Sequence, residues 1–165
     1  MSKNITISFD DNFNASKIDN NKKLILLLTT SKFTKTLEKL LENKVNLNVL
    51  IDTTTDNGLV YNKEFIKMKH NDIIQKTMSK LYKILIDFHN DILYDNEIDI
   101  DKTLSDLILE SINNDYNNFI NNDEFQKNMI IDITNIYDIN NTNTINYIGK
   151  NKTAFFSFFC LNSRF

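Results

Sequence analysis

One third of the way along its 165 residues, the chain reads Thr53-Thr54-Thr55-Asp56-Asn57-Gly58-Leu59-Val60-Tyr61-Asn62-Lys63-Glu64-Phe65. Side-chain oxygens occupy the first, third and fifth positions of this stretch, glycine the sixth, and glutamate the twelfth. A calcium-binding loop of this length needs oxygen ligands at those positions, a sharp turn at the sixth, and a final carboxylate that binds the ion with both oxygens. The spacing therefore predicts that Thr53, Thr55, Asn57 and Glu64 bind Ca²⁺.

Apolar residues recur at helical spacing on both sides of this stretch. The repeats are Phe33, Leu37, Leu40 and Leu41; Ile74, Met78, Leu81, Tyr82, Leu85 and Phe88; Leu104, Leu107, Ile108 and Ile112; and Met129, Ile130, Ile133, Ile136 and Tyr137. Such periodicity indicates amphipathic helices, the second of which we place at roughly residues 72 to 89. The segments between the helices are short and rich in Asn and Asp, so the pattern predicts a mainly α protein.

This alternation of helices and oxygen-rich loops resembles the EF-hand calcium-binding family, in the layout of calmodulin and the myosin light chains. The resemblance covers most of the chain, and residues 52–68 carry its specific motif. It implies paired helix–loop–helix units with very short inter-loop strands, and a helix that begins at Phe65. It also implies two lobes, an N-terminal one at residues 1–112 and a C-terminal one at 113–165, with the seam in the polar stretch 113–122.

Members of this family expose an apolar groove that receives an amphipathic helix of a target protein. The resemblance therefore implies an adaptor, calcium-binding or calcium-independent, and not an enzyme. The candidates to line the groove are Met68, Met78, Leu81, Leu85 and the C-terminal phenylalanines. The alternative is that these side chains simply form the core.

Two further loops match the calcium pattern only in part. In residues 91–102 and 138–149 the closing carboxylate is replaced by Lys102 and Gly149, so we expect neither loop to bind the ion strongly. Paired loops of this family support each other's fold without both binding metal. At most one or two loops of the chain are thus expected to be competent for calcium.

Residues 113–124 also fit the calcium pattern. They begin 25 residues before Asp138 (138 − 113), which is too close for two complete tandem units. We favour the loop at Asp138, and interpret Asn122-Asp123-Glu124 as the capped first turn of a helix. The alternative keeps 113–124 as the C-terminal calcium loop.

A strand interpretation competes for four segments that are β-branched or alternate in polarity, namely residues 4–9, 23–28, 46–51 and 129–134. With a helix between the second and third, residues 23–51 would form a β–α–β unit. The acidic run at Asp52, Thr54 and Asp56 would then suit a magnesium-dependent phosphoryl-transfer enzyme. No glycine-rich phosphate loop accompanies it, so we do not favour this alternative.

Composition limits the function classes. The net charge is −3 and Arg164 is the sole arginine, so a nucleic-acid-binding surface is not expected. The lone Cys160 excludes an internal disulfide framework and favours a reducing compartment, and the longest aliphatic run, Leu24 to Leu28, is too short to span a membrane. We therefore expect a soluble, cytoplasmic protein, whose oligomeric state the sequence leaves open.

Asn and Asp make up about a quarter of the chain, a bias typical of an AT-rich genome. His70 and His89 are far apart and lack a nucleophilic partner at a recognisable spacing, so no catalytic constellation is predicted. The alternative to an EF-hand adaptor is accordingly a small α/β or irregular protein-interaction protein of a virus or mobile element, which works without metal.

Overall fold

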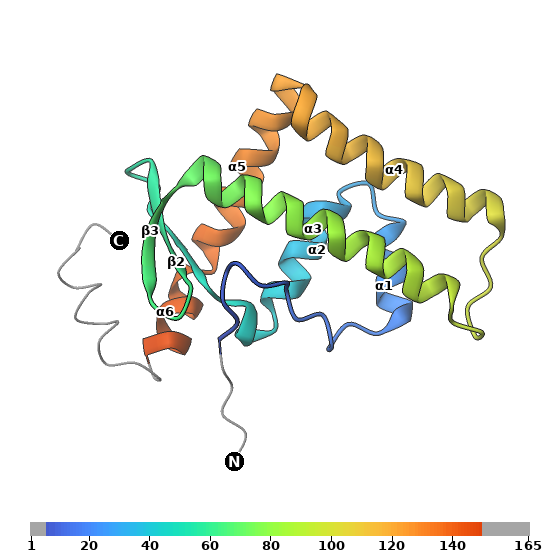
Figure 1. Ribbon diagram of the computed structural model, residues 1–165, viewed down its shortest axis with the longest axis horizontal. Helices are drawn as coiled ribbons and strands as arrows, with labels where there is room; N and C mark the ends of the chain where they lie inside the picture. Colours follow the sequence, from blue (N-terminus) through green and yellow to red (C-terminus); the bar gives the residue numbers. More distant parts are fainter. Residues whose placement is uncertain (1–5, 150–165) are drawn as a thin grey trace, which may run out of the picture.

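Residues 6–149 are described by the computed structural model, in which helices surround one long central helix and a small sheet lies at its end (Figure 1). The helices are α1 (Asn20–Leu27), α2 (Lys32–Leu41), a short 3₁₀ turn (Lys44–Asn46), α3 (His70–Leu93), α4 (Lys102–Asn121), α5 (Asp123–Ile139) and α6 (Asn141–Gly149). The strands are β1 (Val49–Ile51), β2 (Asn57–Tyr61) and β3 (Phe65–Lys69). The prediction of a mainly α protein is confirmed, and all four predicted amphipathic helices are present.

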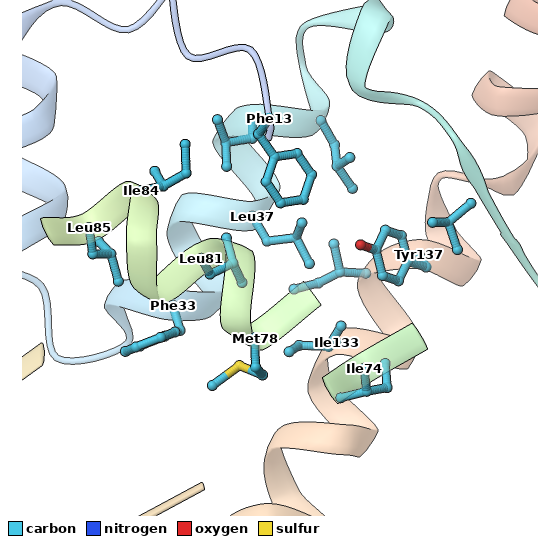
Figure 2. Close-up of a cluster of buried hydrophobic side chains, with 14 of the residues drawn as sticks. Phe13, Phe33, Leu37, Ile74, Met78, Leu81, Ile84, Leu85, Ile133 and Tyr137 are labelled. Atoms are coloured by element: carbon cyan, nitrogen blue, oxygen red, sulfur yellow. The ribbon is translucent and has the colours of Figure 1, made fainter. Parts of the chain in front are cut away.

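The core forms around α3, which packs against α1, α2, α4 and α5. Figure 2 shows side chains from α2, α3 and α5 meeting in one buried cluster: Phe33, Leu37, Ile74, Met78, Leu81, Ile84, Leu85, Ile133 and Tyr137, with Phe13 from the N-terminal segment. Thr77 and Tyr137 share a buried hydrogen bond of 2.8 Å, which satisfies the two hydroxyls inside the cluster. Burial of these helix faces supplies the main drive for folding.

The sheet is antiparallel in the order β1-β2-β3. Because side chains alternate between faces along a strand, Val49, Ile51 and Val60 point into the main core. Leu50 and Leu59 point to the other face, where Ile148 of α6 covers them. Strands β1 and β2 are therefore buried between the main helical core and α6, whereas β3 is largely exposed.

A tight turn joins β2 to β3. Lys63 has a φ of 67°, in the left-handed region, and Asn62 N donates a hydrogen bond to Glu64 O at 2.9 Å. Consequently the helix that the EF-hand resemblance implies at Phe65 is wrong, since residues 65–69 form β3 and the helix begins at His70. The pairing of β3 with β2 through five residue pairs outcompetes a helical start there.

The C-terminal half of the chain also departs from the predicted loops. Residues 138–149 are mostly helix α6, and residues 113–121 are helical because Ile112 and Phe119 bury one face of α4. The predicted helix start at Asn122 is confirmed, since its side chain accepts a hydrogen bond from Phe125 N at 3.1 Å. Neither candidate C-terminal calcium loop is therefore present as a loop between helices.

Residues 91–102 come closest to the predicted form. Helix α3 continues to Leu93, a short connection follows, and α4 begins at Lys102 with the Asp101 side chain as its cap, 2.7 Å from Leu104 N. The boundary predicted at residue 112 lies within α4. Side chains from both sides of that boundary, such as Ile108 and Ile133, belong to the same buried cluster.

Of the four alternative strands, residues 46–51 are partly confirmed as β1. Residues 23–28 and 129–134 lie largely or wholly in helices α1 and α5, so the β–α–β unit is wrong. Residues 6–9 form no strand, and residues 4 and 5 lie outside the described range. Short apolar runs do not distinguish helix from strand by period, and tertiary packing decided each case. No helix within residues 6–149 is long and apolar enough to cross a membrane.

Candidate functional site

The four predicted calcium ligands lie along a strand and its two flanking turns. Thr53 and Thr55 belong to the turn between β1 and β2, Asn57 begins β2, and Glu64 lies in the turn after β2. A strand rises about 3.3 Å per residue, so the four steps from Asn57 to Tyr61 alone cover ~13 Å. Calcium ligands lie within about 2.6 Å of the ion, and these four side chains therefore do not share one site in this fold.

Gly58 allows neighbouring elements to pack closely and does not form a sharp turn. A Cβ atom at this position would lie 2.6 Å from Leu50 O and 2.8 Å from the Ile73 side chain. Its φ is not positive, so it is an ordinary strand residue. Glycine is required here because β1 and α3 both approach the backbone of β2.

Asp52 accepts hydrogen bonds from two threonines of the predicted loop. This buried carboxylate accepts hydrogen bonds from Thr54 N at 3.0 Å, from Thr54 Oγ1 at 2.6 Å and from Thr55 Oγ1 at 3.3 Å. Burial by itself raises the pKa of Asp52, but these bonds and the nearby His70 lower it below its ordinary value. The carboxylate thus stabilises a tight turn, and its contribution is lost as the pH falls through its lowered pKa.

No metal site emerges from the acidic run either. Among residues 6–149, no group of three or more His, Cys, Asp or Glu side chains is placed to hold an ion. Asp56 is exposed, whereas Asp52 is buried and turned toward Thr54. The two carboxylates of the phosphoryl-transfer alternative thus have different surroundings, and that alternative has no geometry to support it.

The residues predicted to line a target groove lie mostly in the core. Met78, Leu81 and Leu85 are fully buried among the helices (Figure 2). Met68, on β3, is partly buried against the same cluster, and the C-terminal phenylalanines lie outside the described residues. The core alternative is therefore correct for the three residues on α3.

Both histidines have partners that the sequence pattern did not reveal. His70 Nε2 donates a hydrogen bond to Asn57 O at 2.8 Å. His89 Nε2 pairs with Ser105 Oγ at 2.8 Å, where α3 meets α4. His89 and Ser105 are 5% and 8% exposed, so a substrate has no route to this pair and we assign it a structural role. Only the helix packing brings these residues together across 16 positions.

The two outer edges of the sheet differ. On the β1 edge, the Asn141 side chain accepts a hydrogen bond from Ile51 N at 3.0 Å and donates one to Ile51 O at 2.8 Å. The amide of Asn141 thereby takes the place of a neighbouring strand. Within residues 6–149, β3 pairs only with β2, and its other side carries no neighbouring strand.

The register shows which groups of β3 point outward. His70 N bonds to Asp56 O at 2.8 Å, and Asn62 N bonds to Glu64 O, so the even-numbered residues of β3 face β2. Because hydrogen-bonded and non-bonded pairs alternate in an antiparallel ladder, Lys67 directs its N–H and C=O groups away from β2, and Lys69 does so with its N–H. Lys69 is the N-cap of α3, so its C=O serves the start of that helix. Both lysine side chains are exposed, and neither forms an ion pair with any residue in the described range.

A hollow of about 300 Å³ lies at the end of this edge, lined by Asp56, Lys69, His70 and Asn71. The outer edge of β3, from Phe65 to Lys69, is thus a basic, extended surface with room beside its last residue. We call it the β3 edge below. No family model, curated protein or solved structure matches the chain.

Proposed function

We propose that the protein is a metal-independent, non-catalytic interaction domain that binds an acidic, extended segment of a partner along the β3 edge. An added strand satisfies its main-chain groups on the exposed edge of a sheet, and charged side chains then select the partner. The observation that carries the proposal is the pair of exposed, outward-facing residues Lys67 and Lys69 on an edge without a neighbouring strand in the described range.

An extended partner replaces the amphipathic helix that the EF-hand resemblance implied. A helix-binding groove needs exposed apolar side chains, but Met78, Leu81 and Leu85 are 0% exposed. The β3 edge offers backbone donors and acceptors with flanking ammonium groups. Those groups suit Asp and Glu side chains on an extended chain.

Lysines on an edge strand also have a protective role, because they discourage unwanted pairing between sheets. The two roles are distinguishable by charge. A purely protective edge rejects every added strand, whereas a binding edge rejects basic and neutral strands and accepts acidic ones. The test therefore compares partners that differ only in charge.

The test is fluorescence anisotropy with two labelled eight-residue peptides, one alternating Asp and Val and the other alternating Lys and Val. We expect saturable binding of the acidic peptide alone, which weakens as salt is added. Lys67→Glu combined with Lys69→Glu should weaken binding about tenfold or more, because attraction becomes repulsion. The matched control, Lys22→Glu with Lys127→Glu, makes the same charge change on the exposed surface of α1 and α5 and should bind as the parent does.

A second variant separates strand pairing from simple charge attraction. Lys67→Pro removes an outward N–H without breaking a bond to β2, and proline is tolerated at such edge positions. Strand addition predicts that this variant loses more affinity than Lys67→Gln, with circular dichroism confirming that both remain folded. Equal binding of both peptides, or equal affinity in all variants, would overturn the proposal.

A further inference from the structure

The connection between α3 and α4 carries exposed acidic residues, as we expect of a partner that binds the basic β3 edge. Its segment Glu97-Ile98-Asp99-Ile100-Asp101 alternates acidic and apolar residues. The three carboxylate residues are exposed, while Ile98 and Ile100 pack against the core. Glu97 lies in a turn in which Asp95 accepts hydrogen bonds from Glu97 N and Ile98 N, and residues 98–101 follow without regular secondary structure. The alternation leaves the acidic side chains toward solvent.

The acidic side chains of this segment are available for a partner. Glu97 and Asp99 form no ion pair with any residue of the described range. Asp101 holds the N-terminus of α4 through Leu104 N. The segment thus presents two carboxylates that the structure around them does not use.

The β3 edge and the acidic segment lie at opposite ends of α3 (Figure 1). Helix α3 has 24 residues, and at 1.5 Å per residue it is about 36 Å long. Lys67 and Glu97 of one molecule therefore cannot meet. Any contact between these surfaces must join two molecules.

Charges of opposite sign flank the two ends of α3. Lys67 and Lys69 precede its N-terminus, where Asp72 in the first turn favours the helix dipole, and the acidic segment follows its C-terminus. The basic groups at one end of the molecule are therefore complementary in charge to the acidic groups at the other end of a second copy.

We propose that the partner segment is residues 97–101 of a second copy of this chain, which docks on the β3 edge in a head-to-tail contact. This inference rests on the proposed function and names its partner. Lys67 and Lys69 of one copy face Glu97 and Asp99 of the next, and the backbone of Asp99 and Ile100, which follows the turn, lies along the outward groups of β3. Such a contact uses two different surfaces and leaves one of each unoccupied, so it extends into chains at high concentration.

The test is a charge exchange followed by sedimentation velocity at low ionic strength. The first variant, Lys67→Glu with Lys69→Glu, has two acidic ends, and the second, Glu97→Lys with Asp99→Lys, has two basic ends. We expect the parent chain to associate with rising concentration and to dissociate with added salt. Each variant alone should lose at least about tenfold in association constant, and an equimolar mixture of the two should associate again.

The recovery in the mixture is the decisive readout, because misfolding of either variant predicts the opposite. Lys22→Glu with Lys127→Glu is the matched control and should associate as the parent does. If a charge-reversed variant does not fold, Lys67→Gln with Lys69→Gln takes its place and should weaken association without reversing the charge. Either a parent chain that stays monomeric, or variants that associate as strongly as the parent, would overturn the inference.

The two proposals fail separately. A parent chain that binds the acidic peptide but stays monomeric retains the proposed function and rejects the second copy as the partner. A parent chain that binds neither the peptide nor itself rejects both. Association that the acidic peptide inhibits by competition supports both together.

Discussion

The two edges of the sheet are made of the same backbone groups but are completed in different ways. The β1 edge is closed by the amide of Asn141, which comes from a position 90 residues further along the chain. The β3 edge instead carries the exposed side chains of Lys67 and Lys69, which belong to the strand itself. The closed edge therefore depends on tertiary packing and is part of the fold. Within residues 6–149, no neighbouring strand covers the lysines of the other edge.

The N-terminal segment completes the closed side of the sheet. Phe9 N donates to Tyr61 O at 2.8 Å, and the Asn48 side chain donates to Ile7 O at 2.9 Å. Lys80 of α3 fixes the same segment, since its ammonium donates to Phe9 O at 2.7 Å and lies over the Phe9 and Phe13 rings. Lys80 is thus a buried lysine with a structural role, in contrast to the exposed Lys67 and Lys69.

The largest effect is expected where the closed side is most tightly packed. Gly58→Ala places a Cβ atom 2.6 Å from Leu50 O, which is backbone and cannot move away alone. We expect a loss of about 3 kcal/mol in the free energy of unfolding, because β1 must separate from β2. Urea denaturation measures it. Ile66→Ala on the more exposed β3 is the comparison and should cost much less, and a similar loss in both would show that the edges are equally tight.

Removing the amide that closes the β1 edge should have the next largest effect. Asn141→Ala leaves the N–H and C=O of buried Ile51 without their partners, at an expected cost of about 2 kcal/mol. Asn143→Ala, an exposed residue on the same helix, is the matched control. Hydrogen exchange sharpens the comparison further: the Ile51 amide should lose protection in Asn141→Ala, while the Lys67 amide exchanges rapidly in every variant.

A pH-dependent effect of intermediate size is expected from Lys80. Burial lowers the pKa of this ammonium to about 7, an effect that Asp10 and Asp11 partly oppose and Lys76 reinforces. In the unfolded chain a lysine keeps its proton up to a pKa of about 10.4, so the unfolded state binds more protons between these values. Stability should therefore rise as the pH increases from 7 toward 10, by about 1 kcal/mol per pH unit.

Denaturation between pH 7 and 9 measures this slope. Lys80→Met should abolish most of it, because the titrating group is gone. Lys83→Met, at an exposed lysine on the same helix that does not act on the pKa of Lys80, should leave the slope unchanged. A parent protein whose stability does not change over this range would show that Lys80 keeps its proton in the folded state.

The smallest effect is expected from calcium. Because Thr53 and Glu64 lie on opposite sides of β2 along the chain, Ca²⁺ should leave the melting temperature unchanged, and Glu64→Gln should not alter this result. Calorimetric titration with Ca²⁺ and then Mg²⁺ provides the direct measurement. A saturable site that Glu64→Gln weakens would restore the prediction for residues 53–64 and would require the β2–β3 hairpin to open.

The apolar periodicity predicted the long helices correctly, whereas the oxygen pattern at residues 53–64 did not predict the strand that occupies them. The repeats from Ile74 to Phe88 and from Met129 to Tyr137 are long enough for their period to be unambiguous, and both are helices. The stretch from Thr53 to Phe65 matches the calcium-loop pattern. The spacing of side-chain oxygens does not, however, determine whether the backbone forms a loop or a strand. Asn and Asp favour turns in general, and in this chain they also fill strand starts and helix caps. The strands were recognised only at residues 46–51.

The His89–Ser105 pair and the Asn141 cap were not predictable for a different reason. Each joins residues from separate elements, and no local spacing encodes such a contact. The lysines of β3 were visible in the sequence as scattered charges. Their position at the edge of a sheet follows only from the register, which places Lys67 and Lys69 on the side of β3 that β2 does not cover.

The sequence by itself determined the helical class and the helix start at Asn122, because periodicity and capping act within a few residues. Tertiary structure alone decided that residues 57–61, in the middle of the predicted calcium loop, form the central strand of a sheet. Gly58 fits between Leu50 and Ile73, and β2 lies between two partner strands, so pairing energy from distant residues outweighed the local preference for a loop.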